Sequence, residues 1–200
     1  MPYGSTLVDS ITSSNNFNII GNVTGATNIT TTGNITTSPG ILYPLMASTP
    51  VNTTSGSPIT LATDLPTWVK RITVVLNGCS LTTAVAPQIQ LGYGTTPTWQ
   101  TTGYDSSSDN YSLTSGPTSS STVGFVVGSA YNIAASWNCN YVLCNITGTN
   151  IWVGSLTGAD RTAGVLIGGG IVTLTDKLTA VRLSSSSGTY DAGSAFILYE

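Results

Sequence analysis

The chain has 200 residues, of which 40% are hydrophobic and only 6% are charged, with a formal net charge of −3. An average soluble domain has roughly 25% charged residues, so hydroxyl and amide side chains must cover much of this surface, which fits a permanent assembly better than a free cytosolic enzyme. Five scattered cations argue against nucleic acid as a partner, and the absence of histidine excludes a Ser-His-Asp or Cys-His catalytic site.

Residues 1–46 form a distinct N-terminal segment with a single charged residue, Asp9. An Asn followed by an apolar residue recurs in it every six residues, and these apolar residues are Phe17, Val23, Ile29 and Ile35. A six-residue period places them on one side of an extended chain, which cannot bury such a stripe alone. We therefore expect an extended arm for trimerisation or attachment to a particle. A small β-helix and a Thr/Asn-rich leader without structure are the alternatives.

The remaining residues, 47–200, are expected to form one β-sandwich domain. Turn signals recur about every ten residues between apolar segments, and no stretch has the apolar spacing of an amphipathic helix. We predict an all-β antiparallel sandwich of jelly-roll type with almost no helix. The expected strands lie near residues 58–63, 69–77, 87–93, 122–128, 141–146, 150–156, 163–174, 178–184 and 194–199.

The stretch 65–77 is the best candidate for a buried central strand, because β-branched and aromatic residues follow Pro66 and a turn signal follows at Asn77. It contains the adjacent cations Lys70 and Arg71. Strand alternation sends these two to opposite faces, so one of them could point inward and pair with an acid. The expected partners lie near the end of the chain, which predicts that the first and last strands of the domain meet.

The longest expected loop covers residues 95–122 and has the composition of a recognition surface. Aromatic and acidic residues are flanked there by Ser and Gly, and aromatic rings give contact area at a low entropic cost. The predicted receptor- or glycan-binding residues are Trp99, Tyr104, Asp105, Asp109 and Tyr111. Packing of these aromatics under the domain edge, or against a neighbouring subunit, is the alternative. A second, weaker candidate loop carries Tyr131 and Trp137.

Catalytic and metal-binding patterns are missing from the sequence. The three cysteines lack a paired metal-ligand spacing, so no metal and no cofactor is expected. Cys139 and Cys144 could bridge across a hairpin, but reduced thiols are the favoured interpretation. Asp105 and Asp109 are the only close carboxylates, and no helix is expected after the glycines at 168–170. We therefore expect no enzyme, and no apolar run reaches the ~18 residues of a membrane span.

Two parts of the chain resemble the globular domain at the C-terminus of many bacteriophage tail-fibre and related virion proteins. The first comprises Leu-Pro-Thr-Trp-Val-Lys-Arg-Ile-Thr-Val-Val-Leu-Asn-Gly at 65–78, Ile-Gln-Leu-Gly at 89–92 and Thr-Gly-Tyr at 102–104. The second comprises residues 177–183 and the ending Tyr-Asp-Ala-Gly-Ser-Ala-Phe-Ile-Leu-Tyr-Glu. That ending is similar to the family's Phe-Asp-Ala-Gly-Ser motif, with Tyr190 in place of Phe. The resemblance covers about residues 56–200 and is weakest at 105–165.

The resemblance implies a homotrimeric component on the exterior of a virion tail or capsid, with the arm docked on other virion proteins. A short tail fibre or knob that binds a host glycan is the first expectation. A capsid decoration protein is the alternative, and a bacterial surface adhesin is a second one that the lack of a visible secretion signal disfavours. Within this resemblance, Asp191 is expected to pair with Arg71 or Arg182, and Gly193 to lie at the turn into the last strand where no side chain fits.

Overall fold

The computed structural model describes residues 45–54, 56–111, 118–129, 133–162 and 164–200, together with the backbone of two strands at 35–37 and 40–42. The chain divides into two compact units, Met1–Leu42 and Tyr43–Glu200. In the first unit, β1 (Ile35–Thr37) pairs antiparallel with β2 (Gly40–Leu42). Phe17, Val23 and Ile29, and the side chain of Ile35, lie outside the described residues, so the oligomerisation arm stays a prediction.

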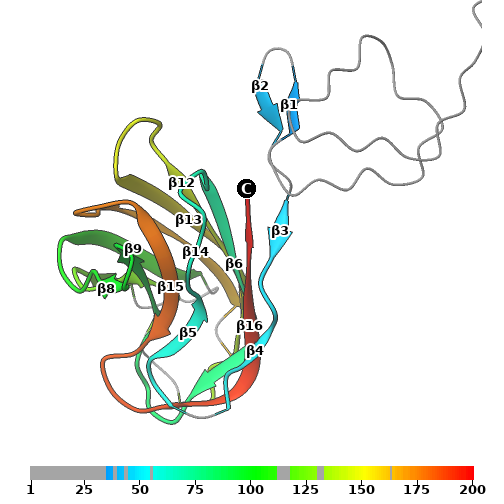
Figure 1. Ribbon diagram of the computed structural model, residues 1–200. Coiled ribbons are helices and arrows are strands. Elements are labelled where there is room, and N and C mark those ends of the chain that lie inside the picture. The colour runs from blue at the N-terminus through cyan, green and yellow to red at the C-terminus, as the bar shows by residue number, and fades with distance from the viewer. Residues whose placement is uncertain are drawn as a thin grey trace, which may run out of the picture. The chain divides into compact units, whose positions relative to one another are not determined.

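The second unit consists of two antiparallel sheets that pack face to face (Figure 1). The large sheet has the strand order β10-β9-β14-β13-β12-β6-β16-β3, with β4 also beside β16, and the small sheet has the order β11-β7-β15-β5, with β8 beside β7. The described residues contain no helix, and so none that could cross a membrane. The prediction of an all-β antiparallel sandwich is confirmed.

The large sheet contains β3 (Met46–Ala47), β4 (Val51–Asn52), β6 (Arg71–Leu81), β9 (Tyr104–Tyr111), β10 (Thr118–Ser121), β12 (Trp137–Asn145), β13 (Ile151–Asp160), β14 (Gly164–Thr173) and β16 (Tyr190–Tyr199). The small sheet contains β5 (Ile59–Ala62), β7 (Gln88–Tyr93), β8 (Thr98–Trp99), β11 (Phe125–Val126) and β15 (Leu178–Ser184). Strands β12, β13 and β14 form a meander of three consecutive neighbours.

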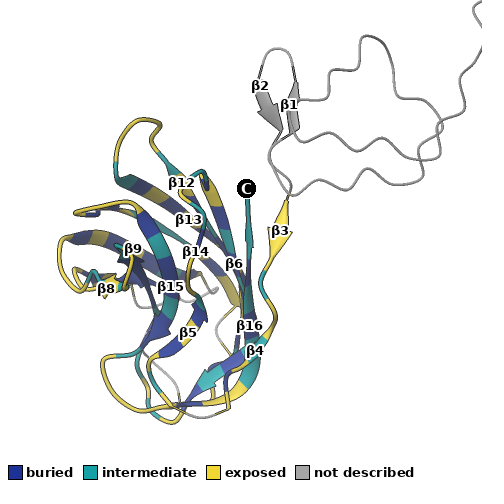
Figure 2. Cartoon of the chain, viewed as in Figure 1, coloured by how far each residue is buried: buried dark blue, intermediate teal, exposed yellow. Residues whose placement is uncertain are grey.

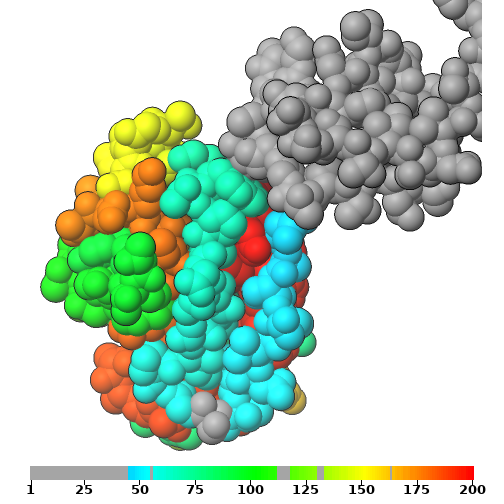
Figure 3. All heavy atoms as spheres, viewed as in Figure 1, coloured from blue at the N-terminus to red at the C-terminus, as the bar shows by residue number. Residues whose placement is uncertain are grey.

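The expected meeting of the first and last strands is confirmed. Strand β6 pairs with β16 from Tyr199 opposite Ile72 to Tyr190 opposite Leu81. The other edge of β16 pairs with β3 and β4, so that the cyan segment and the red C-terminal strand lie side by side in Figure 3. This pairing ties the two ends of the described domain together.

The core lies between the sheets, and buried residues alternate with more exposed ones in the long strands β9, β12 and β13, visible as dark blue bands along the strands in Figure 2. Its largest fully buried side chains are Trp137, Tyr141, Tyr190 and Phe125. The Phe125 ring lies 5.1 Å from the ring of Tyr104, edge to face, and 5.4 Å from the ring of Tyr141. Burying a large apolar side chain contributes roughly 1.5–3 kcal/mol, so this cluster joins the sheets firmly.

The expected loop at 95–122 is wrong in its main part. Residues 104–111 form β9, a long strand inside the large sheet, and β8 and β10 occupy further parts of the same stretch. The expected strand at 122–128 is reduced to the two residues of β11. The period-two alternation in β9 uses serines and an asparagine on its buried side, which a search for apolar alternation does not detect.

Candidate functional site

The side of the large sheet that faces away from the small sheet carries several large exposed side chains. In β9, Asp105, Ser107, Asp109 and Tyr111 point to this side, whereas the residues between them point into the sandwich. We call the surface formed by outward side chains of β9, β14, β13, β12 and β6 the outer face. Its large exposed side chains, with their exposed fractions, are Tyr111 (69%), Val165 (55%), Ile167 (49%), Val153 (42%) and Ile171 (41%).

The strand registers arrange the outer face in rows that run across the strands. One row contains Asp105, Ile171, Val153, Cys144 and Arg71, each directly opposite the next. Opposite residues of neighbouring antiparallel strands have Cβ atoms about 4.5–5.5 Å apart, so their side chains form a continuous ridge. We call this set the Asp105–Arg71 row. It has an acid at one end, a cation at the other and three uncharged side chains between them.

The next row is made of small and polar side chains. It contains Ser107, Gly169, Ser155, Val142 and Thr73. The glycines of β14 are required by the close pairing of its neighbours, because a Cβ atom on Gly169 would lie 2.7 Å from the carbonyl oxygen of Gly154. Gly169 has no side chain and Ser107 and Ser155 have short ones, so this row is lower there than the Asp105–Arg71 row, and rows of unequal height can interlock with another protein surface.

Asp109 lines a hollow of about 220 Å³ on the outer face near β10. Its Oδ1 atom is buried and accepts no hydrogen bond from the described residues. Thr118 and Ile167 lie directly opposite Asp109 on the two neighbouring strands. The structure thus brings three predicted recognition residues, Asp105, Asp109 and Tyr111, to one face, and it separates the other two from them.

Tyr104 is a core residue and not a recognition residue, so its predicted role is wrong. Its side chain is only 2% exposed, and its hydroxyl oxygen accepts a hydrogen bond from the Leu91 amide at 2.9 Å. Burial raises the pKa of Tyr104 above its ordinary value. Trp137, proposed for the second loop, is likewise buried in β12, whereas Tyr131 lies outside the described residues.

Trp99 belongs to the small sheet, on β8, where it contacts a residue that the sequence did not associate with it. The guanidinium carbon of Arg182 lies 4.4 Å from the centre of the Trp99 ring, a cation–π contact. The Nε of Arg182 donates a hydrogen bond to Oε1 of Gln90 at 2.8 Å. No local sequence motif predicts these contacts, because Gln90, Trp99 and Arg182 come from three different strands, β7, β8 and β15.

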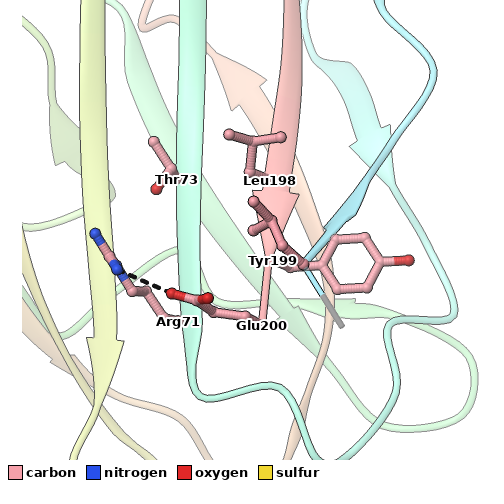
Figure 4. A pocket seen from close by; sticks show the side chains of 6 residues that line it. Arg71, Thr73, Leu198, Tyr199 and Glu200 are labelled. Carbon is pink, nitrogen blue, oxygen red and sulfur yellow. Dashed lines mark hydrogen bonds and ion pairs between the residues drawn. The ribbon is translucent and has the colours of Figure 1, made fainter. Parts of the chain in front are cut away.

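The expected ion pair of Asp191 is wrong. Arg71 instead pairs with Glu200, with Nη1 and Oε1 2.9 Å apart, beside a hollow of about 200 Å³ (Figure 4). Asp191 accepts a hydrogen bond from the Ser80 hydroxyl, and Arg182 bonds to Gln90. Asp191 is exposed at an irregularity of β16, where the register shifts on both sides of Ala192, so its carboxylate needs no buried cation.

The expectation that Lys70 or Arg71 points inward is also wrong. Both are exposed, and Lys70 Nζ lies 3.4 Å from the Asn145 side-chain oxygen. Strand β6 begins at Arg71, whose side chain points outward. The next residue, which points into the core, is Ile72 and not a cation. Exposure avoids the desolvation cost that a buried charge would carry.

The possible disulfide between Cys139 and Cys144 is excluded by their positions on one strand. Cys139 points into the core and Cys144 points to the outer face, and all three cysteines are free. Burial raises the pKa of Cys139 to about 12, with the nearby Cys79 as a lesser cause. The described residues contain no cluster of three or more His, Cys, Asp or Glu that could hold a metal ion.

No protein-family model, curated protein or solved structure matches this chain.

Proposed function

We propose that the chain is a structural protein of a bacteriophage virion, and that its outer face packs against other copies of the chain. The observation that carries the proposal is the Asp105–Arg71 row, in which apolar side chains are exposed between an acid and a cation. The resemblance to virion proteins supplies the context, and the scarcity of charge over the whole sequence fits a surface made for assembly.

The outer face is large enough for a stable contact between copies. Five strands about 4.8 Å apart span roughly 24 Å, and eight residues of a strand span about 27 Å, which gives roughly 650 Å². Stable protein interfaces bury about 800 Å² on each partner, so a few side chains beyond the five strands complete the required area. The large exposed residues named above would supply the apolar centre.

The charges at the two ends of the row favour a copy of the same chain over an unrelated partner. When copies turn their outer faces toward a rotation axis parallel to the strands, the β9 side of one copy meets the β6 side of the next. Asp105 then approaches Arg71 of the neighbouring copy when the axis is two-fold. Opposite charges at a partly buried interface fix its register and suppress wrong pairings.

Such packing would leave the small sheet pointing away from the axis. A short tail fibre or knob needs an outward surface of this kind for a host glycan, and a capsid decoration protein could use the same arrangement for cohesion. Labelling of purified particles with antibody against the chain separates these roles: label at the tail tip supports the fibre, label over the head supports decoration, and the absence of label contradicts a virion protein.

Charge reversal in the full chain tests the outer face, with mass measured by light scattering. Asp105→Arg and Arg71→Asp should each shift the oligomer toward monomer, and the double variant should restore association because the charges are exchanged. Glu200→Gln removes the ion pair within one chain and should leave the mass unchanged, which makes it the control. Equal masses for all four variants would overturn packing through this face.

A further inference from the structure

A second surface, on the small sheet, holds a cation in a fixed position without an acidic partner. We call Gln90, Gly92, Trp99 and Arg182 the Arg182 cluster. In the residues that the structure describes, the one ion pair joins Arg71 to Glu200, so no carboxylate neutralises Arg182. The Arg182 side chain is half-buried, and burial lowers the pKa of its guanidinium. A partly desolvated charge without a counter-ion is unfavourable. The chain has only five basic residues, so the placement of one of them here is unusual.

Two contacts of the guanidinium group, and a third that holds its acceptor Gln90, fix its plane. Its Nε donates to Oε1 of Gln90, and Nε2 of Gln90 donates to the Val123 carbonyl at 2.8 Å. Gln90 is only 6% exposed, so its amide has little freedom to turn away. The guanidinium carbon of Arg182 lies over the Trp99 ring, 4.4 Å from its centre, so the ring supports one face of the guanidinium. Arg182 therefore keeps its orientation without a bound partner.

Gly92 makes room for this arrangement. A Cβ atom at position 92 would lie 3.0 Å from the Cβ of Ala180 and 3.1 Å from Cε3 of Trp99. Gly92 and Trp99 are directly opposite in the pairing of β7 and β8. A side chain at position 92 would displace the indole from the sheet, and with it the support of Arg182.

The outer edge of the guanidinium remains available. The guanidinium donates a hydrogen bond only through Nε, and no described residue accepts one from its two terminal nitrogens. These nitrogens form a planar fork that matches the two oxygens of a carboxylate. Thr60 is directly opposite Arg182 on β5 and is exposed, so its hydroxyl can bond to a polar group beside such a carboxylate.

We propose that the Arg182 cluster binds the carboxylate group of an acidic sugar, such as a uronic acid of a surface polysaccharide. The fork holds the carboxylate, the Trp99 edge contacts the sugar ring, and nearby hydroxyls bond to its hydroxyl groups. The cluster lies on the small sheet, so it stays accessible whether or not copies pack through the outer face. The proposal goes beyond the assembly role and does not depend on it.

Titration calorimetry of the full chain with a galacturonic acid oligosaccharide tests the site, with the neutral galactose oligosaccharide and inorganic phosphate as the other arms. The acidic sugar should bind, and the neutral sugar should bind at least about tenfold more weakly because it lacks the charge-assisted pair. Equal binding of the two sugars overturns the proposal. Phosphate binding as tightly as the acidic sugar also overturns it, because the cluster would then be a general oxyanion site.

Two variants locate the binding on the protein. Arg182→Lys keeps the charge and the apolar stem but loses the fork, so it should weaken the acidic sugar by about tenfold or more. Arg161→Met removes an exposed cation elsewhere and should leave the affinity unchanged. Thermal melting checks that both variants are folded. Should Arg182→Lys melt early, Thr60→Val gives a second probe on an exposed position, and unchanged affinity in both Arg182→Lys and Thr60→Val contradicts the site.

Discussion

Gly193 shows how a single backbone position constrains the last strand. It has a φ of +92°, in the region that favours glycine, and it lies where the pairing of β16 with β6 shifts register between Ala192 and Ser194. A Cβ atom there would lie 2.5 Å from the backbone of Gly78 and Cys79. The prediction that no side chain fits is confirmed, but the position is an irregularity inside the strand and not a turn before it.

Gly193→Ala should lower the free energy of unfolding by about 2–4 kcal/mol, because strained φ and a backbone clash act together. Gly148→Ala is the matched control: its φ is +80°, but no atom lies within 4 Å of an added Cβ. That variant should lose only about 1 kcal/mol from the φ strain. Urea denaturation of both measures the difference, and equal losses would show that the close approach to Gly78 does not matter.

The strand β9 shows which elements the sequence could predict and which it could not. Residues 69–77 and 178–184 are predicted as strands because they are apolar segments between turn signals, and burial and side-chain type agree in the strands β6 and β15 that they form. The buried side of β9 instead carries Ser106 and Ser108, whose hydroxyls donate to the carbonyls of Gly169 and Gly128. These bonds make polar residues acceptable in the interior, and they depend on partners that are distant in sequence.

The outer face could not be predicted for a related reason. Its side chains come from five strands, and only the register places Asp105, Val153 and Arg71 in one row. The low charge content predicts an assembly surface only in general terms. The expected loop at 95–122 includes the three acidic and aromatic residues at the β9 edge of the outer face, Asp105, Asp109 and Tyr111. The position of a residue along its own strand does not say what stands opposite, because a shift of one residue would turn each side chain to the other face.

Ser108→Ala should lower the free energy of unfolding by about 1–3 kcal/mol, because the buried Gly128 carbonyl loses its hydrogen bond from the Ser108 hydroxyl. Ser107→Ala changes the neighbouring, exposed residue of the same strand and should stay within about 0.5 kcal/mol of the unchanged chain. Chemical denaturation of the two variants compares the buried and the exposed side of β9 directly. Similar small losses in both variants would contradict a contribution of the buried Ser108 hydroxyl to the free energy of unfolding.

At the scale of the whole molecule, the packing of two sheets keeps several ionisable groups neutral. Burial raises the pKa of the Cys79 thiol and of the Tyr190 phenol, and it raises the pKa of Cys139 and of Tyr141 to about 12. All four lie in the core between the sheets. A thiolate or phenolate anion is unfavourable inside the sandwich. These groups therefore lose their protons more readily when the core opens.

The stability of the domain should therefore fall in alkaline solution. Below about pH 8 these thiols and phenols are neutral in both the folded and the unfolded chain, so the stability that depends on their staying neutral is fully present. As the pH rises above the ordinary thiol value of about 9, the unfolded chain loses protons that the folded chain keeps, and Cys139 alone lowers the free energy of unfolding by up to about 1.4 kcal/mol per pH unit until about pH 12.

Cys139→Ala removes one of these groups and should make the decline between pH 9 and pH 11 shallower by roughly 1 kcal/mol per pH unit. Cys144→Ala removes the exposed thiol on the opposite side of the same strand and serves as its control, with an expected decline equal to that of the unchanged chain. Urea denaturation at a series of pH values gives both slopes. The same slope in the two variants would mean that the Cys139 thiol ionises without opening the sandwich, and that water reaches this part of the core in the folded state.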